Sequence, residues 1–289
     1  PTVFTGTYAA ANVIQYINVN TTGDAVDFGD RTNDASLPAS TADRTRMVMA
    51  GGYDHPSLLN VIDFVTVAST GNAADFGDLN YLRQNMASGN SPTRSVFANG
   101  SYSGSHNTIS YVTTQSQGDA QDFGDTTVTR SSRRACNSPT RMVIAGGGDP
   151  AFDPIDFITF STTGNAADFG DLLEEKKYAA SASNAVRGLW ASGNRTEPSV
   201  FYNRIEFVTI ATLGNSQDFG DATHSLSHAG ACSSSTRMVV GGGSNPTPTR
   251  TNTMYYIQIM STGDAIDFGD LTHQLDGPVG ASNGHGGLG

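Results

Sequence analysis

The tetrapeptide Asp27-Phe28-Gly29-Asp30 recurs along the whole chain and divides it into repeats. Its six copies begin at Asp27, Asp75, Asp122, Asp168, Asp218 and Asp267. Neighbouring copies lie 46 to 50 residues apart in a chain of 289 residues. An internal period of this length, combined with strand-like segments, is typical of a β-propeller.

A glycine followed by Asp or Asn stands shortly before every copy of the tetrapeptide. The six pairs are Gly23-Asp24, Gly71-Asn72, Gly118-Asp119, Gly164-Asn165, Gly214-Asn215 and Gly263-Asp264. Between two apolar segments, such a pair signals the two-residue turn of a β-hairpin. We therefore expect each tetrapeptide to lie on the strand that leaves a tight hairpin.

The second repeat shows how many strands one period holds. Residues 46–50 form an apolar strand pattern that ends at Gly51-Gly52, and residues 61–67 are rich in β-branched side chains. Residues 73–78 contain the tetrapeptide, and residues 86–90 are mostly small. Four short strands per repeat match one propeller blade.

The third strand of every repeat carries an aromatic residue followed by Ile or Val. The aromatic residues are Tyr16, Phe64, Tyr111, Phe157, Phe207 and Tyr256. Adjacent apolar residues point to opposite faces of a strand, so both faces of each sheet must be covered. We expect the Phe of each tetrapeptide to fill the layer between neighbouring blades.

The strand that ends in paired glycines, together with the aromatic residue in the next strand, resembles the repeat of kelch-type propellers. The pairs are Gly51-Gly52, Gly146-Gly147 and Gly242-Gly243. The other repeats have altered pairs, and the kelch Trp of the last strand is absent. The phrase over residues 69–79, Ser-Thr-Gly-Asn-Ala-Ala-Asp-Phe-Gly-Asp-Leu, is similar to the kelch-like repeat of predicted virion proteins of marine bacteriophages.

These features predict one all-β domain over residues 1–289, a six-bladed kelch-like β-propeller with four antiparallel strands per blade. The approximate repeats are 1–34, 35–82, 83–130, 131–177, 178–226 and 227–277. The kelch order makes the small-residue strand the innermost of each blade. The first repeat lacks such a strand, whereas residues 280–283 have that pattern, so residues 278–289 should close the ring by completing the first blade.

Composition narrows the possible functions. The net charge of −11 argues against binding to nucleic acid or to an anionic membrane surface. No apolar stretch is long enough to cross a bilayer, and membrane insertion is not expected. Cys136 and Cys232 occupy equivalent positions two repeats apart, so we expect two buried thiols and no disulfide.

The repeated carboxylates are candidates for chemistry, but a structural role explains them better. They are Asp27, Asp30, Asp75, Asp78, Asp122, Asp125, Asp168, Asp171, Asp218, Asp221, Asp267 and Asp270. A calcium loop would need more oxygen ligands at alternating positions. The structural alternative is that they accept backbone hydrogen bonds or pair with the repeat arginines, which are Arg46, Arg94, Arg141, Arg187 and Arg237, with Pro1 in the sixth place.

No catalytic residue, metal site or cofactor is predicted. His224 and His228 are four residues apart, which would suit a metal only on a helix, and here they flank the start of a strand. Phosphate-binding loops, dinucleotide fingerprints and nucleophile elbows are missing from the sequence. We therefore do not expect an enzyme.

The loops predict a candidate binding surface. In an antiparallel blade, the second-to-third strand loops and the connections between blades emerge on the same face, and these segments differ from repeat to repeat. We expect this face to present Tyr53, His55, Tyr102, His106, Phe152, Phe201, Tyr202, His224 and His273. Variable loops on a rigid frame often carry recognition, although unconstrained loops also drift without a function.

Three functions remain open. The leading hypothesis is a non-enzymatic virion component, such as a tail-fibre, baseplate or capsid-surface module, which would be assembled in the host cytoplasm. Its variable loops would bind a host receptor, glycan or protein, or other virion proteins. The alternatives are an intracellular kelch-type module that binds peptides, and a glycan-active enzyme with a site at the mouth of the central channel.

Overall fold

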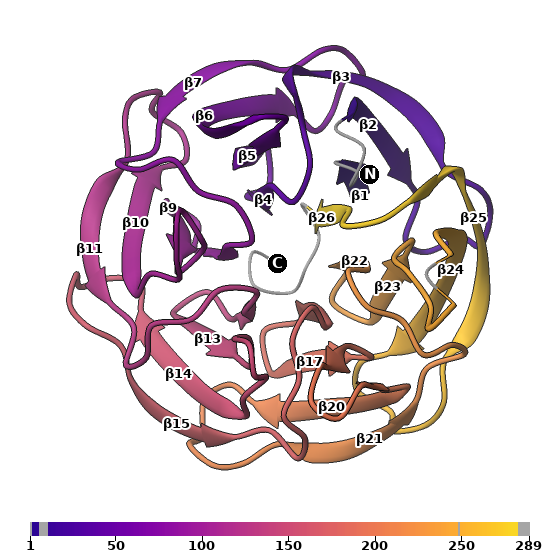
Figure 1. Cartoon of the computed structure of the whole chain (residues 1–289). Helices are drawn as coiled ribbons and strands as arrows, with labels where there is room; N and C mark the ends of the chain where they lie inside the picture. Colours follow the sequence, from indigo (N-terminus) through magenta and orange to yellow (C-terminus); the bar gives the residue numbers. More distant parts are fainter. Residues whose placement is uncertain (1, 6–10, 248, 283–289) are drawn as a thin grey trace.

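The computed structural model describes residues 2–5, 11–247 and 249–282. Six four-stranded antiparallel sheets are arranged in a ring, which confirms the predicted six-bladed β-propeller (Figure 1). The described residues form strands, turns and loops without a helix, and accordingly none of them belongs to a helix that could cross a membrane.

Each blade contains four strands, named here from the axis outward. Blade 1 contains β26 (Val279–Ser282), β1 (Thr2–Thr5), β2 (Ala11–Ile17) and β3 (Val26–Ala35); blade 2 contains β4 (Ala39–Ala42), β5 (Arg46–Asp54), β6 (Ser57–Thr66) and β7 (Ala74–Asp78); blade 3 contains β8 (Ala87–Asn90), β9 (Arg94–Ala98), β10 (Thr108–Thr113) and β11 (Gln121–Asp125). Blade 4 contains β12 (Arg134–Asn137), β13 (Arg141–Ala145), β14 (Pro154–Thr159) and β15 (Ala167–Asp171); blade 5 contains β16 (Ala180–Ser183), β17 (Arg187–Ala191), β20 (Arg204–Thr209) and β21 (Gln217–Asp221); blade 6 contains β22 (Gly230–Ser233), β23 (Arg237–Gly241), β24 (Thr251–Gln258) and β25 (Ile266–Leu275). A small extra hairpin, β18 (Asn194–Arg195) with β19 (Val200–Phe201), interrupts blade 5.

The C-terminal strand closes the ring, as expected. β26 pairs antiparallel with β1, with Thr2 opposite Ser282 and Thr5 opposite Val279. The last described strand therefore becomes the innermost strand of the first blade, and Figure 1 shows β26 beside β1. Residues 283–289 of the predicted closing segment lie outside the described residues.

The small-residue strands surround the axis. Neighbouring members of the set β4, β8, β12, β16, β22 and β26 contact one another around the ring. Small side chains are needed here because six strands converge on a narrow channel. Cys136 on β12 and Cys232 on β22 are both buried and unpaired, as predicted.

The hydrophobic core consists of layers between blades. Phe28 of blade 1 packs in one buried cluster with Met47, Val65 and Val67 of blade 2. Each tetrapeptide Phe also meets the third-strand aromatic of its own blade edge-to-face, with ring centroids 5.8–6.2 Å apart. The predicted place of this Phe between blades is confirmed.

The predicted two-residue hairpin at the Gly-Asn and Gly-Asp pairs is wrong. In blade 2 the chain turns earlier, where the Ser69 N–H donates to the Thr66 carbonyl at 3.2 Å. The Gly71 N–H then donates to the Phe28 carbonyl of blade 1 at 2.8 Å, and the Asn72 side chain accepts from the Asp30 N–H at 3.0 Å. The pair therefore joins two blades and does not form the turn of one blade.

We call this junction the rim contact, and it is repeated at all six blade interfaces. The glycine N–H donates to the carbonyl of the preceding blade's tetrapeptide Phe at 2.7–3.0 Å. The Asp or Asn Oδ1 accepts from the N–H of that tetrapeptide's last Asp at 3.0–3.1 Å. Only this one oxygen is used, which explains why Asp and Asn alternate freely at the position.

The tetrapeptide glycine permits the rim contact. A β-bulge at the Phe-Gly step shifts the register of the outer strand, as between Ile62 and Asp63 of β6 opposite β7. A Cβ on Gly77 would lie 2.6 Å from the carbonyl carbon and oxygen of Gly118 in the next blade. Gly77 also has a φ of +145°, which residues with a side chain rarely adopt.

The repeat arginines do not pair with the repeat carboxylates within the described residues, so that expectation is corrected. Each arginine lies over the third-strand aromatic of its own blade, at 4.4–4.8 Å from the ring centroid. Each also donates to a backbone carbonyl of the next blade at 2.6–3.3 Å. Pro1, in the sixth place, lies outside the described residues.

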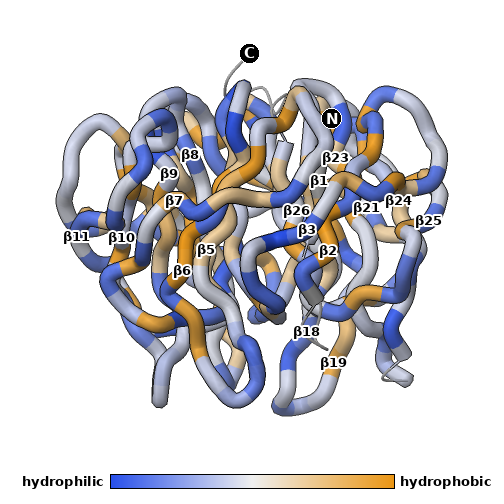
Figure 2. The backbone as a smooth tube through the Cα atoms, turned by 90° about the horizontal axis from the view of Figure 1, so that it is seen from above, coloured by the Kyte–Doolittle hydropathy of each residue, from blue (hydrophilic) through white to orange (hydrophobic). Residues whose placement is uncertain are grey.

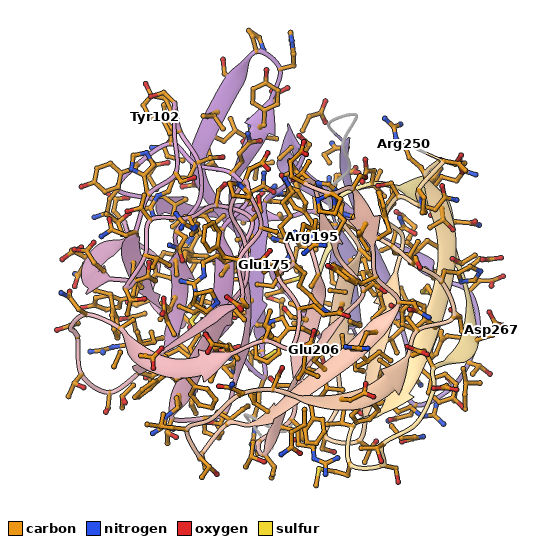
Figure 3. All side chains as sticks on the ribbon, turned by 60° about the horizontal axis from the view of Figure 1, so that its bottom comes forward. Tyr102, Glu175, Arg195, Glu206, Arg250 and Asp267 are labelled. Atoms are coloured by element: carbon orange, nitrogen blue, oxygen red, sulfur yellow. The ribbon has the colours of Figure 1, made fainter. Side chains whose placement is uncertain are left out.

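The repeat carboxylates form a belt around the rim of the disc. The first Asp of every tetrapeptide is exposed, as Asp267 illustrates at the edge of Figure 3. The last Asp contributes its backbone N–H, and not its carboxylate, to the rim contact. Burial and the neighbouring charges of Asp153 and Asp168 raise the pKa of Asp171. The rim contact uses backbone groups of the tetrapeptide, so the Asp carboxylates are not needed in the blade interfaces.

Candidate binding face

The two faces of the disc are built from different kinds of connection. On one face, backbone bridges in four of the blades join the blade-to-blade connection to the loop between the second and third strands: Ser36 to Tyr53, Gln84 to Ser101, Lys177 to Asn194 and Ser227 to Ser244. We call this the variable face; its described segments are 36–38, 55–56, 79–86, 99–107, 126–133, 146–153, 172–179, 192–203, 222–229, 242–247, 249–250 and 276–278. The β18–β19 hairpin projects from it in the side view (Figure 2).

The opposite face repeats one turn design. The turn between the first and second strands is closed by a short polar side chain that accepts from the backbone two and three residues later. In blade 3, Ser91 Oγ accepts from the Thr93 and Arg94 N–H groups at 3.3 and 3.0 Å. Asp43, Ser138, Asn184 and Ser234 do the same in blades 2, 4, 5 and 6. This shared requirement explains why these turns hardly vary.

The predicted binding residues are spread around the face, each in contact with its own blade or connection. The Tyr53 and His55 rings meet edge-to-face at 5.8 Å, and a ring nitrogen of His106 lies 3.0 Å from the Tyr102 carbonyl. Phe152 lies beneath the Arg130 guanidinium at 3.9 Å. No group of three His, Cys, Asp or Glu side chains within the described ranges could hold a metal ion. The structure therefore does not gather the predicted residues into one site.

Three of the predicted loop residues lie in strands. Tyr53 belongs to β5, Phe201 to β19 and His273 to β25. β5 is longer than predicted because its pairing with β6 continues to Asp54 opposite Ser57. β25 likewise extends to pair Leu275 with Thr251. Tyr202 and His224 lie outside the strands, in loops. The Lys176 ammonium lies 5.4 Å from the centroid of the Tyr202 ring.

Sequence reasoning missed a buried polar position just before the third-strand aromatic. It is occupied by Gln15, Asp63, Ser110, Asp156, Glu206 and Tyr255, all at most 1 % exposed. Each contacts the preceding blade or the connection that leaves it: Gln15 meets Thr272, Asp63 meets Arg31, Ser110 meets Arg83, Asp156 meets Arg133, Glu206 meets Lys176, and Tyr255 meets Ser192. An acidic residue between apolar neighbours, as in Ile62-Asp63-Phe64, was the signal that could have found it.

These buried partners hold the bases of the variable loops in place. Arg133 illustrates this, because its guanidinium binds Asp156 at 2.5 Å and also donates to the Ile144 and Pro154 carbonyls at 2.8 and 3.1 Å. Removing one member of such a pair leaves an uncompensated buried charge. The loop bases are therefore anchored by buried ion pairs and hydrogen bonds.

Blades 4 and 5 carry a network of charges on the variable face. Glu174 pairs with Arg204 at 3.0 Å and lies 3.6 Å from Lys176, while Arg195 pairs with Glu175 at 3.6 Å. Figure 3 shows Glu175 and Arg195 close together near the middle of the view. The network joins the connection 172–179 to the β18–β19 hairpin and orders this sector.

Two exposed tyrosines lie on adjacent loops at blade 3. Tyr81 is 58 % exposed and Tyr102 is 49 % exposed, and the backbone bridge between Gln84 and Ser101 joins their loops. Leu82 is exposed beside Tyr81. Tyr102 stands at the outer edge of the molecule in Figure 3. Tyr81 was not among the predicted residues, because only the tertiary structure brings its loop beside that of Tyr102.

A ring of six residues with left-handed backbone surrounds the channel mouth on this face. They are Leu37, Asn85, Ser132, Tyr178, His228 and Gly277, with φ between 52° and 78°. Around the ring, from Asn85 to Gly277, each N–H donates to the carbonyl of the preceding member at 2.9–3.4 Å. Five of the six are not glycine, and backbone strain of this kind tends to accumulate at functional sites.

The mouth carries two titratable groups with displaced pKa values. His228 stacks on Tyr178 with ring centroids 3.6 Å apart, and its Nδ1 lies 4.0 Å from an Asp276 carboxylate oxygen. Burial, with the nearby charges of Arg134 and Lys177, lowers the pKa of His228 to about 3. Burial also raises the pKa of Asp276. His228 is therefore neutral at physiological pH.

The channel behind the mouth is lined by the inner strands. Two adjoining cavities of about 70 and 60 Å³ lie along it. Their walls share Ser40, Ser88, Ala135, Ser181 and, opposite them, Ala231 and Gly280. A passage of this size admits water or a small ion and excludes a sugar or a peptide.

Comparison with known proteins adds no family assignment. No protein-family model matches the chain. No curated protein is significantly similar to it. The fold is therefore established by the structure itself, as a six-bladed β-propeller.

Proposed function

We propose that this protein is a non-enzymatic recognition module of a virion, which binds its partner through the variable face. The supporting observation is the contrast between the two faces. One set of turns is held to a single design by its capping side chains, whereas the other set differs in every blade. Loops that differ from blade to blade on a repeated frame are more typical of a recognition surface than of a purely structural element.

The exposed tyrosine pair is the part of this face that we expect to contact the partner. Tyr81 and Tyr102 offer two large amphipathic rings on anchored loops, with Leu82 beside them. Tyrosines of this kind are enriched in protein interfaces, where one ring supplies both apolar area and a hydroxyl group. The proposed partner is a host-surface glycan or protein, or a neighbouring virion protein.

The virion assignment rests on the resemblance of residues 69–79 to the repeat of phage virion proteins. Its first test is mass spectrometry of purified particles against soluble lysate. Recovery in stoichiometric amounts with particles supports the assignment. Recovery in the soluble fraction alone refutes it and brings forward the intracellular peptide-binding module.

The binding face has a separate test. The double variant Tyr81→Ala/Tyr102→Ala should reduce binding to host cells or to particles lacking the protein, at an unchanged melting temperature. Leu213→Ala is the matched control, because Leu213 is equally exposed at 58 % but lies in a turn on the opposite face. If the control weakens binding and the tyrosine variant does not, the partner binds the opposite face.

An enzyme is the second candidate, and one observation favours it. His228 and Asp276 lie together beside the channel mouth with displaced pKa values, as an acid–base pair would. Turnover of glycans that is lost in His228→Gln would support this reading. Turnover that persists in that variant would exclude this pair as its source.

A further inference from the structure

A cavity of about 300 Å³ lies on the opposite face, where blades 3 and 4 meet. We call it the junction cavity. It is lined by the turns between the first and second strands of both blades, at residues 91–94 and 139–140, and by residues 160–161 of blade 4. Pro92 and Pro139 supply apolar surface to its wall. Its volume is at the lower end of the range of about 300–1,000 Å³ that is typical of small-molecule pockets.

The two prolines distinguish this junction from the others. Blades 2, 5 and 6 have Arg44, Ala185 and Ser235 at the same turn position, so two neighbouring turns with proline occur once between blades 2 and 6. A proline ring is rigid and fixes its own φ angle. The serine cap of each turn also holds the backbone in place. The apolar wall is therefore formed before a ligand arrives, which lowers the ordering cost of binding.

Arg94 is the single charged side chain in the wall of the junction cavity. Its guanidinium lies 4.7 Å from the centroid of the Tyr111 ring, and Nη1 donates to the Phe160 carbonyl at 2.6 Å. The side chain is half-buried, and its Nε and Nη2 are neither buried nor hydrogen-bonded to another described residue. Arg94 also has no ion pair with a carboxylate of the described residues. It is thus a fixed cation with unused donors beside an apolar wall.

We propose that the junction cavity binds a small carboxylic acid with a compact apolar body, such as an aromatic or branched-chain acid. Nε and Nη2 form one edge of the Arg94 guanidinium, and the two parallel N–H groups of such an edge match both oxygens of a carboxylate. The apolar body packs against Pro92 and Pro139. The wall has a positive side chain and no negative one, so its charge favours an anion. This inference is independent of the variable face and of the virion assignment.

The test uses benzoate and isovalerate as the acids and benzamide as the neutral analogue of benzoate, all at equal ionic strength. Backbone amide NMR shifts of Thr93 and Thr140 follow the binding, because both residues line the cavity and the neighbouring prolines have no N–H. The shifts should saturate with benzoate. Benzamide should bind at least about tenfold more weakly, because it cannot form a charged pair with the arginine. The acid with the lower dissociation constant identifies the preferred apolar body.

The repeats supply a matched control. Arg94→Gln should remove the preference for benzoate over benzamide. Arg141→Gln should leave it unchanged, because Arg141 makes the same two contacts one blade later, with the Phe157 ring and the Ile210 carbonyl, but does not line the junction cavity. Both variants lose equivalent packing, so a difference between them reports the ligand and not the fold. Pro139→Ser, which installs the blade 6 residue, should weaken benzoate and benzamide alike, because it removes apolar area and keeps the charge.

Several results would overturn the proposal. One is the absence of saturating shifts at Thr93 and Thr140 with either acid. Another is an equal dissociation constant for benzoate and benzamide, or binding of benzoate that is unchanged in Arg94→Gln. Equal shifts at Thr45 and Thr236, which hold the corresponding position in blades 2 and 6, would show that the acids bind any arginine of this face.

Discussion

The rim contact predicts that Gly124→Ala lowers the free energy of unfolding by about 5 kcal/mol. A Cβ at Gly124 would lie 2.5 Å from the carbonyl carbon and oxygen of Gly164 in the next blade. Both atoms belong to the backbone, so no side-chain rotation relieves the overlap. Gly124 also has a φ of +142°, which an alanine rarely adopts.

The magnitude has two parts. The backbone conformation costs an alanine about 2 kcal/mol. Moving the blades apart would break three hydrogen bonds: Gly164 N–H to Phe123 O at 2.7 Å, Ala166 N–H to Asp125 O at 2.8 Å, and Asp125 N–H to Asn165 Oδ1 at 3.0 Å. At about 1 kcal/mol each, these add about 3 kcal/mol.

Gly164→Ala separates the two parts within the same contact. Gly164 has a similar φ of +154°, but a Cβ there would have no neighbour within 4 Å. This variant should therefore lose only the conformational part, about 2 kcal/mol. The difference between the two variants measures the overlap and the broken hydrogen bonds.

Urea unfolding followed by tryptophan fluorescence is the assay. Trp190, the single tryptophan, is fully buried in β17 of blade 5 and reports loss of packing there. The slope with urea must match that of the wild type for the free energies to be compared. Equal destabilisation by the two variants, or a loss below about 1 kcal/mol in Gly124→Ala, would show that the blades do not meet at this glycine.

Four other predictions address the remaining parts of the frame. Asp122→Ala, on the exposed rim, should change stability by less than about 0.5 kcal/mol; a larger loss in urea unfolding would mean that its carboxylate makes a contact. Arg141→Ala removes a hydrogen bond of 3.0 Å to the Ile210 carbonyl and the cation–π contact with Phe157, and should lower the free energy of unfolding by about 2 kcal/mol in the same assay. An unchanged urea midpoint would contradict this. Asp156→Ala leaves Arg133 buried without its partner, so a loss of about 3–5 kcal/mol is expected in calorimetry, and a loss below about 1 kcal/mol would contradict the role of this pair. Because the pKa of His228 is lowered in the folded state, the unfolded chain binds a proton first as pH falls below about 6.5, and folding stability is lost between about pH 6.5 and 3. His228→Gln should recover about 2–3 kcal/mol of that loss near about pH 4.5. Parallel profiles of unfolding free energy against pH for the variant and the wild type would refute this.

The candidate site was harder to predict than the fold. The sequence predicted that the variable loops share one face, because strand direction alone places alternate connections on the same side of an antiparallel sheet. It did not identify Tyr81 as the neighbour of Tyr102, because their loops belong to different repeats and meet only through the bridge at Gln84 and Ser101.

The number of blades, the four strands in each, and the closure by the C-terminal strand could all be predicted from the amino-acid sequence. This was possible because these features depend on local patterns that are repeated six times, and on one missing strand whose counterpart stands at the other end of the chain. Periodicity reports which face of a strand is buried, but not which residue covers it. Three contacts between blades could be found only in the folded chain: the Gly71 N–H donates to the Phe28 carbonyl, Arg46 donates to the Thr114 carbonyl, and Asp63 forms an ion pair with Arg31. These partners are 32 to 68 residues apart along the chain, and they meet only when one blade docks against the next.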